Sequence, residues 1–140
     1  MIESISAIIL ATHDMPRAVR FYRMLGFEVI YGGDDAAFTS FRAGTSYLNL
    51  IAQPAERTWS WWGTRHLLTI PDVDALHASV VAAGYRPDTA PRDAEWGERS
   101  FHLTDPDGHE LSFAKPLLKA LAVVARHARL PASPIATHSS

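Results

Sequence analysis

The first half of the chain alternates short apolar runs with one amphipathic segment. Residues 5–11 form a partly β-branched apolar run, which predicts a buried strand. Residues 14–26 carry apolar side chains at helical spacing, between an aspartate suited to cap a helix and a glycine suited to end one. Residues 27–31, 37–41 and 47–52 predict three more strands. The predicted order is therefore β-α-β-β-β.

The second half repeats this order. Residues 66–70 predict a strand, and a second helical stripe follows it. The capping aspartate and the terminating glycine are 12 residues apart in both halves, at Asp14 and Gly26 and at Asp72 and Gly84. Two alternating strands around Phe101 and Leu111 close the second half. An internal repeat of this size indicates two copies of one structural unit.

The repeat predicts an α+β fold made of two β-α-β-β-β units. We expect one domain over residues 1–116, with units at 5–52 and 66–115 and a linker at 53–65. After Pro116, apolar side chains again keep helical spacing, which predicts a C-terminal helix over residues 117–130. Residues 131–140 are rich in Pro, Ala and Ser and predict a flexible tail.

Composition narrows the classes of function. The chain of 140 residues is 47% apolar and 20% charged with a net charge of −2, as in an ordinary globular protein. It lacks the basic run expected of a nucleic-acid-binding protein. It has no cysteine, which excludes disulfides, thiolate metal sites and cysteine nucleophiles. Without a signal peptide or a membrane-spanning apolar run, the expected location is cytoplasmic, with no membrane partner.

The closing hairpin is the most specific motif in the chain. Trp96-Gly97 precedes an alternating strand, an Asp-Pro-Asp-Gly turn at residues 105–108 and a second strand. This order, together with the repeat, resembles the vicinal oxygen chelate superfamily of glyoxalases, extradiol dioxygenases and bleomycin-resistance proteins. The resemblance covers residues 5–114. It implies a curved half-barrel sheet with helices outside, and a two-fold homodimer.

The resemblance also implies where a metal would bind. Metal-dependent members carry ligands at four strand positions, which hold Ala7, Asn49, His66 and Ser112 here. Only His66 matches, whereas a catalytic divalent site needs about three ligands. Glu110 shares a face with Ser112 but would replace it only if the strand shifted by two residues. We therefore expect no metal and no other cofactor.

The tryptophans suggest that the protein binds a ligand by aromatic stacking rather than through a metal ion. Of the four tryptophans, three lie in the linker at Trp59, Trp61 and Trp62, and the fourth is Trp96. They could cap the core or line a dimer contact, or they could stack on a flat ligand. In bleomycin-resistance proteins the tryptophan of the Trp-Gly pair contacts the planar drug tail, which implies this role for Trp96. His102 shares a strand face with Ser100, and if Phe101 and Leu103 pack against the helices it is predicted to face the ligand cavity that the curved sheet would form.

These observations predict metal-independent binding of a small planar or aromatic molecule, such as in drug or toxin sequestration, rather than enzymatic turnover. One alternative is a metal-dependent lyase, isomerase or dioxygenase that uses His66. Another is a metal-free enzyme with His66 or His102 as general base. The predicted ligand-binding residues are Trp96, His66, Asn49, Ser112, His102, Trp59, Trp61 and Trp62.

Overall fold

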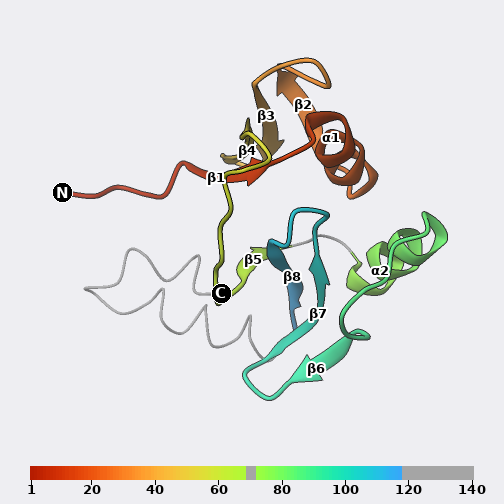
Figure 1. The fold of residues 1–140 in the computed structure, drawn as a ribbon. Coiled ribbons are helices and arrows are strands. Elements are labelled where there is room, and N and C mark those ends of the chain that lie inside the picture. The colour runs from red at the N-terminus through yellow and green to blue at the C-terminus, as the bar shows by residue number, and fades with distance from the viewer. Residues whose placement is uncertain (69–71, 118–140) are drawn as a thin grey trace. The chain divides into compact units, whose positions relative to one another are not determined.

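The computed structural model describes residues 1–68 and 72–117 (Figure 1). Its elements are β1 (Ala7–Thr12), α1 (Met15–Met24), β2 (Glu28–Tyr31), β3 (Phe38–Ala43), β4 (Ser46–Ala52), β5 (Arg65–Leu68), α2 (Val73–Ala82), β6 (Arg92–Ala94), β7 (Glu98–Thr104) and β8 (Glu110–Pro116). The predicted α+β class and the repeated β-α-β-β-β order are confirmed. Beyond Leu117, the predicted C-terminal helix and tail lie outside the described residues.

The chain divides into two compact units. The first unit comprises residues 1–63 together with 104–109, and the second begins at residue 64 and contains the remaining elements. The turn of the closing hairpin thus belongs to the first unit, while its two strands belong to the second.

No helix in the described part of the chain is both long and apolar enough to cross a membrane.

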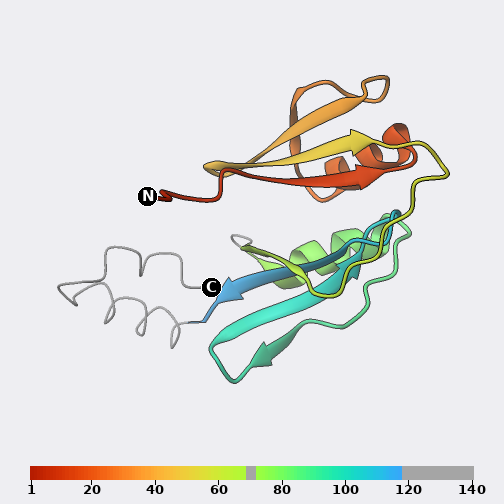
Figure 2. The ribbon, with the colours of Figure 1, turned by 60° about the vertical axis from the view of Figure 1, so that its left-hand side comes forward.

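A four-stranded sheet with the order β1-β4-β3-β2 forms the first unit. Strands β1 and β4 run parallel, with Ile9 paired to Asn49, and they lie side by side in Figure 2. The remaining pairs are antiparallel. Helix α1 packs on one face of the sheet, where Leu48, Leu50 and Phe41 are buried. The opposite face therefore carries the alternate side chains.

Local chemistry fixes the ends of α1. The carboxylate of Asp14 accepts a hydrogen bond from the Arg17 N–H at 3.1 Å, as an N-cap does. At the other end Gly26 adopts a φ of +99°, a conformation that strains other residues. Phe21 and Tyr22 point from the helix into the core and are fully buried. The helix is thus specified both by its caps and by its apolar stripe.

The hairpin turn is tied to the first unit by hydrogen bonds. Oδ1 of Asp105 accepts from the N–H groups of Asp107 and His109 at 2.8 and 2.9 Å. Its Oδ2 accepts from the Tyr22 hydroxyl at 2.6 Å. Arg17 donates to Asp107 at 2.8 Å, and the Asp107 side chain is 1% exposed. The Asp-Pro-Asp-Gly sequence therefore does more than turn the chain, because both carboxylates anchor it.

The second unit repeats the plan with the sheet order β5-β8-β7-β6. Helix α2 packs on β8 and begins at the Asp72 cap, whose carboxylate accepts from the Ala75 N–H at 3.1 Å. On the helix side of the sheet, the rings of Phe101 and Phe113 stack with centroids 5.3 Å apart. His77 of α2 meets the Phe101 ring edge-on at 5.1 Å.

An arginine fork joins α2 to two strands of the second unit. Arg99 donates to both carboxylate oxygens of Asp74, at 2.8 and 2.9 Å, and to Asp93 at 3.0 Å. The hydrogen bonds from Arg99 hold the pKa of the Asp74 carboxyl below its ordinary value of 3.8. The hydrogen bonds to Asp74 and then Asp93 likewise raise the pKa of Arg99, so that it stays charged.

Candidate functional site

Four side chains of the second unit meet on the sheet face opposite α2. Phe101 and Leu103 of β7 are buried toward the helix side, so Glu98, an odd number of positions away, lies on the other face. The parallel pairing of β5 and β8 puts His66 opposite Ser112. We call the set of Trp96, Glu98, His66 and Ser112 the indole–histidine cluster.

The cluster is one continuous chain of hydrogen bonds. Nε1 of Trp96 donates to Oε1 of Glu98 at 3.0 Å. Nε2 of His66 lies 3.2 Å from Oε1 and 3.3 Å from Oε2 of the same carboxylate. Nδ1 of His66 lies 3.2 Å from the Ser112 hydroxyl oxygen. Glu98 and Ser112 are 6% and 3% exposed, whereas the side chain of His66 between them is 30% exposed.

The chemistry of the groups sets the direction of the hydrogen bonds. An ionised carboxylate only accepts, so Nε2 of His66 must carry a proton when it faces ionised Glu98. In the neutral ring Nδ1 then has a free lone pair, and the Ser112 hydroxyl donates to it. Both ring nitrogens of His66 are therefore engaged within the protein.

The indole of Trp96 is held by a hydrogen bond at its N–H edge, and the residue is largely exposed to solvent. Trp96 is 70% exposed, although the only polar atom of its side chain, Nε1, is hydrogen-bonded to Glu98. The hydrogen bond to buried Glu98 limits the rotation of the indole without covering the ring. An exposed but oriented aromatic ring is the arrangement expected of a stacking platform.

The residues do not fit the metal site that the resemblance implies. In the second unit His66 is already bonded through both nitrogens, and the register places Ser112, not Glu110, opposite it. In the first unit Ala7 offers no donor and Asn49 only a neutral amide. Among the described residues, no group of three or more His, Cys, Asp or Glu side chains comes together as metal ligands.

Asn49 and Trp59 lie in the first unit. Asn49 is half-buried on the sheet face away from α1, and its Oδ1 is buried without a hydrogen-bond partner in the described part of the chain. Trp59 donates from Nε1 to the Asp107 carbonyl oxygen at 3.1 Å. Its ring stacks on His109 at a centroid distance of 5.8 Å and lies 4.3 Å from that of His13. These contacts give Trp59 a structural role in holding the turn.

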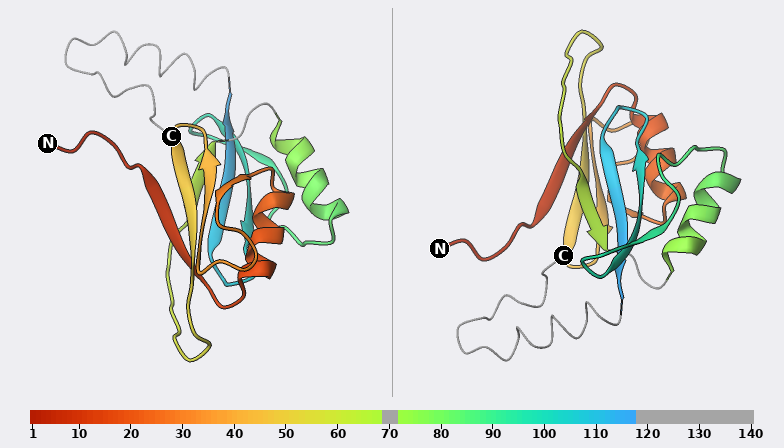
Figure 3. Two further views of the ribbon diagram at one scale, coloured as in Figure 1. Left: turned by 90° about the horizontal axis from the view of Figure 1, so that it is seen from above. Right: turned by 90° about the horizontal axis from the view of Figure 1, so that it is seen from below.

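The other two linker tryptophans are exposed. The segment after β4, yellow-green in Figure 3, runs beyond the end of that strand before the chain turns back. Trp61 is 62% and Trp62 is 94% exposed on this segment. His102, the remaining predicted residue, is half-buried on β7, where its N–H donates to the Thr89 hydroxyl at 2.9 Å.

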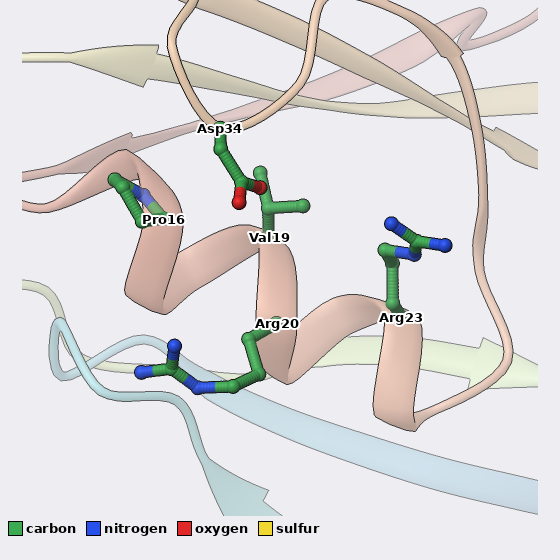
Figure 4. Close-up of a pocket in the computed structure, with 5 residues that line it drawn as sticks. All are labelled: Pro16, Val19, Arg20, Arg23 and Asp34. Carbon is green, nitrogen blue, oxygen red and sulfur yellow. The ribbon is translucent and has the colours of Figure 1, made fainter.

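Two of the hollows bordered by described residues lie in the first unit. The larger measures about 420 Å³ and is lined by Ile9, Ala11, Ile51, Gln53, Arg57, Thr58 and Trp59. The smaller measures about 290 Å³ and lies over α1, where Asp34 reaches across Val19 (Figure 4). Arg20 and Arg23 line the smaller hollow too, so it is bordered chiefly by charged groups on the outer surface of a helix. Only the larger has the apolar floor typical of a ligand site.

Sequence reasoning missed Glu98, although a signal for it was present. The alternation that places Ser100 and His102 on one face of β7 extends back to Glu98. A carboxylate next to a Trp-Gly pair on that face is a candidate partner for an inward histidine. The sequence does not show how far apart the side chains of different strands lie. It therefore could not show that Glu98 contacts His66 rather than His102.

A family model and several solved structures point to the same superfamily. The model of the family described as "Glyoxalase/Bleomycin resistance protein/Dioxygenase superfamily" matches residues 4–113. A search of curated proteins gives no match. The chain is similar in structure to a bleomycin resistance determinant encoded on the transposon Tn5, with 23% identity, a TM-score of 0.67, and coverage of 83% of this chain and 100% of that one.

Two further solved structures illustrate the range of this fold. A lactoylglutathione lyase from Agrobacterium tumefaciens is 19% identical, with a TM-score of 0.66 and coverage of 82% of this chain and 95% of that one. A glyoxalase/bleomycin resistance protein/dioxygenase from Nocardioides is 20% identical, with a TM-score of 0.66 and coverage of 84% and 86%. At these identities the likeness shows the fold alone.

Proposed function

The chain belongs to the glyoxalase/bleomycin resistance protein/dioxygenase superfamily, and on this premise we propose that it binds a small planar molecule without using a metal ion. The observation that carries the proposal is Trp96, whose ring is exposed while its N–H is held by buried Glu98. In this role Trp96 is the stacking surface and Glu98 is the residue that positions it. His66 and Ser112 supply the polar groups beside it.

Stacking on a fixed ring is favourable because the protein does not lose rotamer entropy when the ligand arrives. Contact of one planar group with one aromatic side chain contributes roughly 1–3 kcal/mol in single-strand stacking platforms. The proposal extends the sequence-based prediction for Trp96, His66 and Ser112. Roles for Asn49, His102, Trp61 and Trp62 in the same binding stay predictions.

Ligand chemistry favours binding over metal-assisted catalysis. A divalent ion at His66 would have to displace either Glu98 or Ser112 from the ring, and no further carboxylate or imidazole completes a ligand set in the described residues. We therefore assign Glu98 to positioning Trp96 and His66, and no step of the proposed function passes through a metal.

A metal-free enzyme with His66 as general base is the second candidate. The observation in its favour is the buried carboxylate of Glu98 behind the ring, since such a group orients an imidazole and stabilises its protonated form. To act on a substrate, Nδ1 would have to exchange its hydrogen bond with Ser112 for one with the reacting group. This candidate predicts turnover, and the binding proposal does not.

A calorimetric titration with bleomycin, a probe that carries a planar group, tests the proposal. Wild type is expected to give a saturable isotherm, and Trp96→Ala to bind about tenfold more weakly or worse, since 1.4 kcal/mol corresponds to a decade. Trp96→Phe keeps an aromatic ring and should lose less affinity. Val81→Ala, an exposed change on α2, serves as the matched control and should bind as wild type does.

Equal affinity of wild type and Trp96→Ala would contradict the role of Trp96, and absence of binding by bleomycin and other planar antibiotics would contradict the function. The metal-independent part is tested on the same protein. After dialysis against EDTA, binding should persist, and elemental analysis of protein purified without chelator should find no stoichiometric zinc, iron, manganese or nickel. A stoichiometric ion whose removal abolishes binding would establish the metal-dependent alternative.

A further inference from the structure

We propose that residues 118–130, which we call the strap, fold over the exposed ring of Trp96, and that a planar ligand must displace them before it can stack there. The inference rests on the proposed function, because it concerns access to the same ring. The strap lies outside the described residues. Trp96, which receives the strap, and Leu117, from which it continues, are described and belong to the second unit.

The chain reaches the strap directly beside Trp96. The N–H of Leu117 donates to the carbonyl oxygen of Gly97 at 2.9 Å, and Gly97 is the neighbour of Trp96 in the chain. The residue that precedes the strap is therefore anchored next to the exposed indole. A helix rises about 1.5 Å per residue, so Leu121 would follow Leu117 by only about 6 Å and would be within reach of the ring.

The strap carries an apolar stripe that needs a covering surface. Helical spacing aligns the side chains of Leu117, Leu121, Val124 and Ala128. The same spacing directs the cations of the strap away from this stripe, at Lys119, Arg126 and Arg129. Isolated helices shorter than about 12–15 residues are marginal in water, and most of their stability in proteins comes from packing of the apolar face. The stripe therefore favours contact with an exposed apolar surface nearby.

Trp96 offers such a surface at the place where the strap begins. In the described part of the second unit, the exposed large apolar residues are Trp96, at 70%, and Val81, at 51%. Val81 lies on α2, on the other side of the sheet from the indole–histidine cluster. Covering the indole would desolvate little polar surface, because Nε1 of Trp96 is already hydrogen-bonded to Glu98. The stripe and the ring thus match in chemistry and in position.

The strap and the rest of the chain carry opposite charges. Residues 118–140 contain three of the 13 basic residues and none of the 15 acidic ones. Residues 1–117 therefore hold the other 10 basic residues and all 15 acidic ones, a net charge of −5. Beside Trp96, Glu95 is exposed and takes part in none of the ion pairs found among the described residues. This charge difference attracts the strap to the surface that its stripe would cover.

The anchor at Leu117 makes docking of the strap intramolecular. A short tether gives the tethered group an effective concentration on the order of mM, so that even a weak contact can be populated. A ligand binds only the open fraction of the molecules, so a strap closed in about nine of ten molecules would weaken its apparent affinity about tenfold. The strap would thus set the affinity of the stacking site without making a contact with the ligand.

The first test measures the accessibility of Trp96 without any ligand. Leu121→Gln on the stripe and Ala122→Gln on the other side of the strap form a matched pair in the full chain. Acrylamide quenches the fluorescence of accessible indoles, and subtracting the signal of the same protein carrying Trp96→Phe isolates the contribution of Trp96. Quenching of Trp96 should increase in Leu121→Gln and stay at the wild-type level in Ala122→Gln. Val124→Gln should act as Leu121→Gln does, and it decides the result if Leu121→Gln does not fold.

The second test measures ligand affinity by calorimetry with bleomycin. Leu121→Gln and Val124→Gln should bind it more tightly than wild type does, by about tenfold if the strap is closed in about nine of ten molecules. Ala122→Gln should bind it as wild type does. Tighter binding is the expected sign because the two substitutions open the site, whereas damage to the fold would weaken binding.

The proposal fails if Trp96 is quenched equally in wild type and in both stripe variants. It also fails if quenching increases but bleomycin affinity does not, because the strap would then cover the ring without competing for it. Increased quenching accompanied by conversion of a dimer to a monomer in sedimentation velocity would assign the covering contact to a second copy of the chain instead. Absence of bleomycin binding by every protein would contradict the proposed function, while the quenching result would still decide whether the strap covers Trp96.

Discussion

The carboxylate of Asp105 stabilises the closing turn by accepting hydrogen bonds on both of its oxygens. The residue is 4% exposed, and its two oxygens accept from two backbone N–H groups and from the Tyr22 hydroxyl. A carboxylate is needed here because it accepts on both oxygens, whereas an amide offers only one. The turn motif that indicated the family from sequence is therefore also the point at which the chain returns to the first unit.

Replacing Asp105 should reveal this role. Asp105→Ala leaves two backbone donors and one hydroxyl without their acceptor, and we expect a loss of about 3 kcal/mol or more in the free energy of unfolding. Tyr22→Phe removes only the hydroxyl and should cost about 1–2 kcal/mol. Urea denaturation of the two variants beside wild type measures both. Equal losses would show that the backbone donors of the turn are satisfied without Asp105.

Among the helices and strands, the features that could be predicted from the sequence are those set by residues close together in the chain. The caps of both helices, at Asp14 and Asp72, and the glycines that end them were predictable because each acts within one turn of the chain. The strands of the first unit were predicted from short apolar runs, with ends that differ by at most two residues, whereas β6 was not located from the sequence. The fork of Arg99 was not, since it joins α2 to β6 and β7 through residues 25 and 6 positions away.

The Arg99 fork predicts how the stability of the second unit depends on pH. The folded pKa of Asp74 lies below its ordinary value of 3.8, so the ionised form is favoured by folding. Its stabilisation is present above that value and is lost as the pH falls through the lower folded pKa. Thermal unfolding of wild type and Asp74→Asn should therefore differ at neutral pH and converge toward pH 2. A difference that stays constant down to that pH would contradict the assignment.

Asp93→Asn is the matched comparison for this element. Asp74 receives two hydrogen bonds from Arg99, and Asp93 receives one. At neutral pH we therefore expect a smaller loss of stability for Asp93→Asn than for Asp74→Asn. The reverse order would indicate that the fork holds β6 rather than α2.

For the whole molecule, the repeat and the family could be read from the sequence, but only part of the candidate site could. Strand parity predicted that His66 and Ser112 share a sheet face, and the register of β5 and β8 sets them opposite each other. Asn49 pairs with Ile9 on the face of the first sheet away from α1. Parity gives a face and not a distance, so it did not show that Glu98 joins His66 to Trp96. Nor did it show that Trp59 supports the turn, because its partners come from residues about 50 positions away.

The sheet of the first unit also carries partly exposed apolar side chains on its face opposite α1. Its α1 side is filled by Leu48 and Leu50, whereas Ile9, Tyr47 and Ile51 on the opposite side are 58%, 39% and 38% exposed. An apolar sheet face of this kind is normally buried against another layer or another subunit. A second copy of the chain is the partner that closed two-fold symmetry would provide.

We therefore expect a homodimer at micromolar concentration, as sedimentation velocity would show. Tyr47→Glu places a charge on the exposed face and should raise the dimer dissociation constant about tenfold or more, because burying an unpaired carboxylate costs well above 1.4 kcal/mol. Val81→Glu puts the same charge on α2, outside this face, and should leave the dimer intact. A wild-type monomer throughout the micromolar range, or equal dissociation of both variants, would show that this sheet face is not where two chains meet.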